Sequence, residues 1–180
     1  GHNLRGILGT ASTVRERLSQ EYWSLIVRSE AEFFQHCQGD TALGGRAPQE
    51  VLRQLETLSM QIAAMTGEQT DRMTRDDGWR MLTLGRYTER LNFFSQGLSP
   101  AFYSNAAHDF DGYEAILALF DSTISFHALY QQHQNLASLL DLLVISRENP
   151  RSLGFITQAV RGVLDELRRN APEGSPDFAE

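Results

Sequence analysis

Apolar residues recur every three to four positions along most of the chain, which is the pattern of amphipathic helices. From about Leu4 to His36 this spacing predicts one long first helix. The glycine-rich segment 39–46 interrupts the pattern and predicts a loop. A second helix is predicted from Pro48, a residue that suits the first helical position, to about Thr66.

The third predicted helix carries the strongest start signal. Thr74 can cap it while Asp77 reaches back in a capping box, so we expect the helix to begin near Thr74 and to end at about Gly97, before Pro100. Residues 98–111 are rich in serine, asparagine and alanine and predict a surface connection.

The C-terminal part of the chain predicts three further helices. The first spans about 113–133. The short apolar segment 136–146 is expected to form a buried helix rather than a strand, because its neighbours are helical. Asn149 followed by Pro150 predicts a cap and first residue for a last amphipathic helix that ends at about Asn170.

The predicted fold is therefore all-α, a bundle of about six helices. A length of 180 residues suits one domain with a sizeable core, which we expect over residues 1–170. Residues 171–180 contain two prolines and a glycine and are expected to form a disordered or loosely attached tail. No apolar run approaches the ~20 residues that cross a bilayer, so no membrane partner and a cytoplasmic location are expected.

Composition excludes several chemistries. The net charge of −7 argues against a nucleic-acid partner. All 16 basic residues other than histidine are arginines, which excludes a Schiff-base lysine and a phosphate-loop lysine. Cys37 is the only cysteine, and the five histidines show no ligand spacing, so no metal and no cofactor are expected.

The third predicted helix places charged residues inside its apolar face. Arg86 and Glu89 fall in one apolar stripe, and Arg90 lies between two stripes. An unpaired buried charge is very costly, so each arginine is expected to be largely buried beside a carboxylate, and removal of Arg90 is expected to cost about 3–5 kcal/mol. The predicted polar core comprises Arg15, Glu21, Arg86, Glu89, Arg90 and Asp141. Two interpretations remain open at this point: an ion-pair network that locks the bundle, or a buried binding site.

Three ordered motifs, in segments 14–23, 73–90 and 140–153, together resemble the bacterial alpha-E domain, a helical domain named for its Glu-Arg motif. Here that motif is Glu89-Arg90, and the last segment contains Asn-Pro-Arg-Ser at 149–152. The resemblance implies that the chain is the C-terminal part of a longer domain. It also implies a context, because such domains occur beside or fused to ATP-grasp amide ligases and transglutaminase-like proteins.

The expected function is that of an accessory helical domain in a bacterial peptide-ligation or peptide-modification system, which binds the ligase or its peptide substrate. One alternative is an enzyme whose Arg/Glu site acts on a carboxylate- or phosphate-bearing substrate, although no catalytic residue can be assigned. A purely structural oligomerisation module, and with it a homo-oligomer, is a further alternative. The candidate substrate or anion contacts are Arg75, Asn149 and Arg151.

Overall fold

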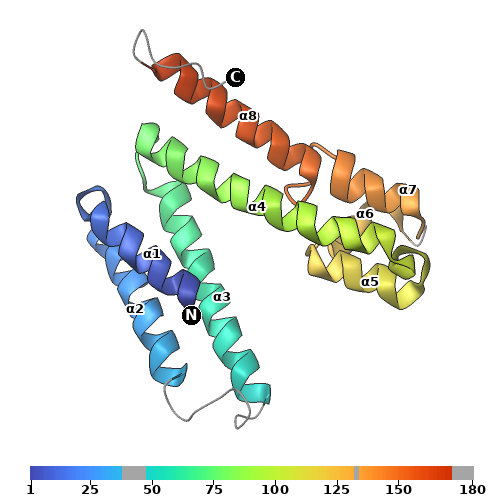
Figure 1. The fold of residues 1–180 in the computed structure, drawn as a ribbon, viewed down its shortest axis with the longest axis horizontal. Coiled ribbons are helices and arrows are strands. Elements are labelled where there is room, and N and C mark those ends of the chain that lie inside the picture. Colours follow the sequence, from blue (N-terminus) through green and yellow to red (C-terminus); the bar gives the residue numbers. More distant parts are fainter. Residues whose placement is uncertain (38–47, 132–133, 172–180) are drawn as a thin grey trace. The chain divides into compact units, whose positions relative to one another are not determined.

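The computed structural model describes residues 1–37, 48–131 and 134–171. These residues form eight α-helices and, within the described ranges, no β-strand, which confirms the predicted all-α class. They group into two compact units, residues 1–74 and 75–180, where the sequence predicted one bundle over residues 1–170 (Figure 1). The predicted loop 39–46 and, apart from Ala171, the predicted tail lie outside the described residues.

Within its described residues the first unit contains three α-helices, with α2 and α3 packed side by side and α1 against α2 (Figure 1). Its core forms around buried Ala11, Ile26 and Met65. A hydrogen bond of 2.5 Å from Gln61 Nε2 to Glu32 Oε2 also joins α3 to α2. The elements are α1 (His2–Thr13), a 3₁₀ turn (Arg15–Arg17), α2 (Gln20–Cys37) and α3 (Pro48–Asp71).

The expectation of one helix from 4 to 36 was wrong, because the chain breaks between α1 and α2. The Ser19 hydroxyl accepts a hydrogen bond from the Tyr22 N–H at 3.0 Å and so starts α2. Arg15 donates to the Leu18 carbonyl at 2.9 Å and also to the Gln20 side chain. The apolar spacing gave no sign of the break, because a 3₁₀ turn keeps a three-residue period.

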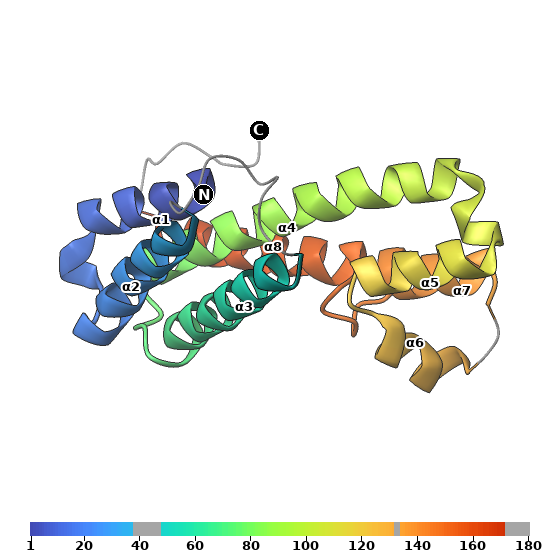
Figure 2. The same cartoon turned by 90° about the horizontal axis from the view of Figure 1, so that it is seen from below.

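The second unit is built on two long helices, α4 and α8, which run side by side in opposite directions (Figure 1). The short helices α5, α6 and α7 gather at the C-terminal end of α4 (Figure 2). The elements are α4 (Asp77–Tyr103), a 3₁₀ turn (Asn105–His108), α5 (Phe110–Leu119), α6 (Thr123–Tyr130), α7 (Leu136–Leu140), a π-helical turn (Asp141–Ile145) and α8 (Leu153–Asn170).

Both expected ends of the third helix were wrong. Asp76 rather than Thr74 caps α4, because its carboxylate accepts the Trp79 N–H at 3.0 Å. At the other end α4 passes through Pro100 and ends at Tyr103. Proline removes only one helical N–H, and the Ser104 N–H still donates to the Pro100 carbonyl at 2.8 Å, so the last turn keeps its closing bond.

The expected helix over 113–133 is instead two helices, α5 and α6. Asp121 adopts a φ of 47°, in the left-handed region, and ends the run of helical residues. The buried Ser122 donates from its hydroxyl to the Phe120 carbonyl at 3.0 Å, which satisfies a backbone group that the break exposes. The expectation that segment 136–146 is helical is confirmed, since α7 and the π-helical turn cover it.

The core of the second unit lies where α5, α6, α7 and the π-helical turn meet the C-terminal half of α4 and the start of α8. Tyr113 and Phe126 stack edge to face, with ring centroids 5.3 Å apart. The Tyr113 hydroxyl donates to the Asn135 carbonyl at 3.1 Å, so the buried phenol keeps a partner. Its fully or almost fully buried side chains include Tyr113, Leu117, Phe120, Phe126, Leu139, Leu142, Leu143 and Ile156.

Alkaline unfolding should report on Tyr113. Burial raises the pKa of its phenol to about 12, whereas the unfolded phenol titrates near its ordinary pKa of about 10. The folded state therefore retains the proton, and this stability is complete below pH 10 and lost as the pH rises from about 10 to 12. Urea unfolding from pH 8 to 12 should show a smaller alkaline loss for Tyr113→Phe. The same substitution at Tyr103, which is 90% exposed, should leave the loss unchanged.

Candidate functional site

Asn149 shapes the turn formed by residues 146–152, which connects the π-helical turn (Asp141–Ile145) to α8. Its side chain is buried, with Nδ2 donating to the Leu142 carbonyl at 3.0 Å and Oδ1 accepting the Arg151 N–H at 3.0 Å. One amide thus satisfies a buried carbonyl and a turn N–H at the same time. Asn149 was predicted as the cap of the last helix, but it lies before the helix and shapes the turn.

Ser152 is the actual cap of α8 and is fully buried. Its hydroxyl accepts the Phe155 N–H at 3.0 Å and donates to the Ser146 carbonyl. Close to it, Gly154 leaves no room for a side chain, because a Cβ there would lie 2.6 Å from the Ile145 carbonyl oxygen. The start of α8 is therefore packed tightly against the end of the π-helical turn.

Two arginines tie this turn to other elements of the second unit. Arg90 Nη2, from α4, donates to the Pro150 carbonyl at 2.8 Å. Arg151 forms an ion pair with Asp121, in the connection between α5 and α6. The Glu-Arg and Asn-Pro-Arg-Ser motifs therefore meet in space, joined by the bond between Arg90 and Pro150. We call this meeting point, formed by Arg90 and residues 149–152, the motif junction.

The electrostatic surroundings of Arg90 are positive. Burial lowers the pKa of its half-buried guanidinium below the ordinary value; Tyr87 opposes this shift, while Arg86 and Arg151 add to it. The structure thus brings Arg86, Arg90 and Arg151 into one neighbourhood. The charge-assisted bond from Arg90 to the Pro150 carbonyl offsets part of the cost of burying the guanidinium.

The structure differs from the predicted polar core in its carboxylates. Glu89 is exposed and contacts no hydrogen-bonding or ionic partner within the described ranges. Asp141 is also exposed and accepts a hydrogen bond from the Tyr130 hydroxyl instead of pairing with an arginine. Arg86 and Arg90 were expected to be largely buried and are only partly buried, because part of the supposed buried stripe faces solvent, and Phe93 within it is 52% exposed.

Three other predicted residues do not form part of this junction. Arg15 and Glu21 belong to the first unit, where Arg15 is used in the turn before α2 and Glu21 is exposed. Arg75 is exposed at the start of the second unit, with its guanidinium 4.6 Å from the Trp79 ring centroid.

A second connection between α4 and α8 escaped the sequence analysis. Arg80 Nε donates to Glu166 at 2.8 Å, and its Nη1 lies 3.1 Å from Asp77. Asn170 Nδ2 donates to the same Asp77 carboxylate at 2.9 Å. Arg80 therefore joins α4 to the C-terminal part of α8, whereas Arg90 joins α4 to the turn that precedes α8. No local sequence pattern predicts such pairs.

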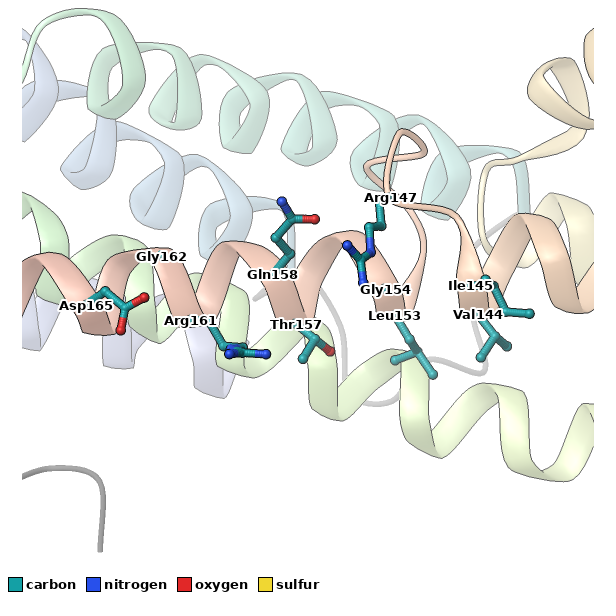
Figure 3. Close-up of a pocket in the computed structure, with 10 residues that line it drawn as sticks. All are labelled: Val144, Ile145, Arg147, Leu153, Gly154, Thr157, Gln158, Arg161, Gly162 and Asp165. Carbon is teal, nitrogen blue, oxygen red and sulfur yellow. The ribbon is translucent and has the colours of Figure 1, made fainter.

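A groove of about 640 Å³ lies along α8 and beside the turn that precedes this helix (Figure 3). Arg147 extends from the turn, and Arg161 projects from α8 two turns beyond Gly154 (Figure 3). Neither guanidinium has a hydrogen-bond or ionic partner in the part of the chain that the structure describes. The lining residues are Val144, Ile145, Arg147, Leu153, Gly154, Thr157, Gln158, Arg161, Gly162 and Asp165.

The described residues offer neither a metal site nor a membrane-spanning helix. They contain no group of three or more histidine, cysteine, aspartate or glutamate side chains placed to hold a metal ion. In the same ranges, every helix is too short or too polar to cross a membrane.

The chain belongs to the Alpha-E family, described as a predicted alpha-helical domain with a conserved ER motif, whose sequence model matches residues 1–179. It is 23% identical over 178 residues to the uncharacterized protein Rv2567 of Mycobacterium tuberculosis and to the uncharacterized protein Mb2597 of Mycobacterium bovis. Each match covers 97% of this chain and 20% of the relative, so the chain spans about a fifth of these relatives' length. No solved structure gives a significant match.

Replacing Arg90 should cost less than the sequence suggested, because its observed partner is a carbonyl and no carboxylate would be stranded. We expect Arg90→Met to lower the free energy of unfolding by about 1–2 kcal/mol, the value of a partly exposed bond from a charged donor. Glu89→Ala is the matched control and should change it by less than about 0.5 kcal/mol. A loss above 3 kcal/mol, measured by urea unfolding, would contradict this prediction and support the buried ion pair expected from the sequence.

Proposed function

We propose that this chain is an accessory binding domain of a bacterial peptide-ligation or peptide-modification system. The observation that carries the proposal is the internal use of its motif residues. Arg90, Asn149, Arg151 and Ser152 all bond to the chain's own backbone or side chains. Residues engaged in this way stabilise the turn before α8, which favours a structural role for the motif over a role in clamping a substrate or moving a proton.

The remaining member of the signature also supports binding rather than catalysis. Glu89 is exposed on α4 and has no hydrogen-bonding or ionic partner within the described ranges, whereas a general acid or base is normally held in place by neighbouring groups of a cleft. A carboxylate on an open helix surface is well placed to contact a partner. The family resemblance implies that this partner is an ATP-grasp ligase or a transglutaminase-like protein.

An assay of ATP-dependent amide formation tests the proposal. The purified chain is mixed with ATP, magnesium and glutamate or a short peptide, and phosphate release and amide product are followed. The reaction is then repeated with an ATP-grasp ligase encoded beside an Alpha-E domain. We expect no turnover by the chain alone, and a change in kcat or KM of the ligase when the chain is added.

Two outcomes would overturn this function. Turnover by the chain alone that is lost in folded Glu89→Gln would make it an enzyme. If the ligase is unaffected and sedimentation instead shows a stable homo-oligomer, the domain is an oligomerisation module.

A further inference from the structure

We infer that the groove along α8 is a binding site for an acidic peptide segment. This inference deepens the proposed function, because it gives a peptide ligand a place on the chain. The groove is distinct from the motif junction: the junction residues Arg90, Asn149 and Ser152 do not line it.

The two arginines define the charge of the ligand. Arg147 and Arg161 both line the groove, and neither forms an ion pair or a hydrogen bond with a described residue. An arginine guanidinium binds a carboxylate through two parallel hydrogen bonds, which favours carboxylate side chains as the ligand groups. The net charge of −7 repels an acidic ligand in general, so any affinity must come from local contacts such as these.

The shape of the groove favours an extended peptide. From Gly154 to Asp165 one face of α8 lines it, a length of about 16 Å, which accommodates about five extended residues. Thr157 and Gln158 offer groups that can hydrogen-bond a peptide backbone, and Leu153 with Val144 gives an apolar end. Asp165 marks the opposite end and disfavours a carboxylate there.

The turn that the motifs stabilise also shapes this site. Arg147, Leu153 and Gly154 lie within or beside the segment that Asn149, Ser152 and Arg90 hold in place. The family motifs would then act on the ligand indirectly, as positioning residues for the wall of the groove.

Calorimetric titration of the full chain with hexaglutamate at low salt tests the inference. We expect binding that weakens with added salt, and a loss of affinity of about tenfold for Arg147→Gln and for Arg161→Gln, as one charge-assisted contact is removed. Arg28→Gln, the same change of charge at an exposed arginine that pairs with Glu32 and does not line the groove, is the matched control and should bind like the wild type. Asp165→Asn should bind more tightly.

Four results would overturn the inference. These are no binding of hexaglutamate, equal binding of hexaglutamine, equal weakening by Arg28→Gln, and displacement of the peptide by an equal concentration of inorganic phosphate. Loss of self-association in the two arginine variants, without peptide binding, would instead make the groove a contact between copies of the chain. The ligase assay uses a different readout, so failure of peptide binding and failure of the proposed function are distinguishable.

Discussion

Replacing Phe126 with alanine should lower the free energy of unfolding by about 3–5 kcal/mol, the cost of deleting a fully buried aromatic ring. The ring packs against Tyr113 and Tyr130, with centroids 5.3 and 5.2 Å away, so its removal leaves a cavity between α5 and α6. Urea unfolding monitored by circular dichroism measures the loss.

Phe110→Ala is the matched control for this prediction, because the same atoms are removed from a ring that is 66% exposed. It should cost less than about 1 kcal/mol, since little apolar surface returns to water. Equal losses at the two positions would contradict the placement of Phe126 at the centre of the second unit.

Replacing Asn149 with alanine should cost about 2–4 kcal/mol, because both the Leu142 carbonyl and the Arg151 N–H lose their partner in a buried place. The loss should exceed that of Arg90→Met, whose bond to Pro150 is exposed. Thermal and urea unfolding of the two variants under one condition make the comparison.

Asn149→Asp separates the two bonds that the amide makes. The carboxylate can still accept from the Arg151 N–H, but its second oxygen would face the Leu142 carbonyl without a proton to donate. We expect a loss at pH 7 at least as large as that of the alanine variant. A stable aspartate variant at pH 7 would show that the amide donor is not needed.

Periodicity was sufficient for the helical class but insensitive to the breaks. The apolar spacing continues across Ser19 and across Asp121, where polar side chains and one left-handed residue end a helix without disturbing the pattern. Asn149 and Ser152 are both good caps, and only the position of the buried Leu142 carbonyl decides which of them starts α8.

The candidate site could be predicted only in part. The stripes of the third helix and the motif at 149–152 drew attention to Arg90 and to this turn, and the structure joins the two through the bond from Arg90 to Pro150. A carboxylate partner was expected because buried charges are normally paired. The observed partner is the Pro150 carbonyl, sixty residues along the chain, and a backbone oxygen leaves no mark in a sequence.

Amide hydrogen exchange, measured residue by residue in the wild type and in Arg90→Met, tests most directly whether the Glu-Arg motif holds the turn before α8. If the bond from Arg90 to Pro150 fixes this turn, exchange should accelerate at residues 151–156 and stay unchanged at the Tyr113 and Phe126 core, and Glu89→Ala should match the wild type. Unchanged exchange at 151–156 in Arg90→Met would contradict the account.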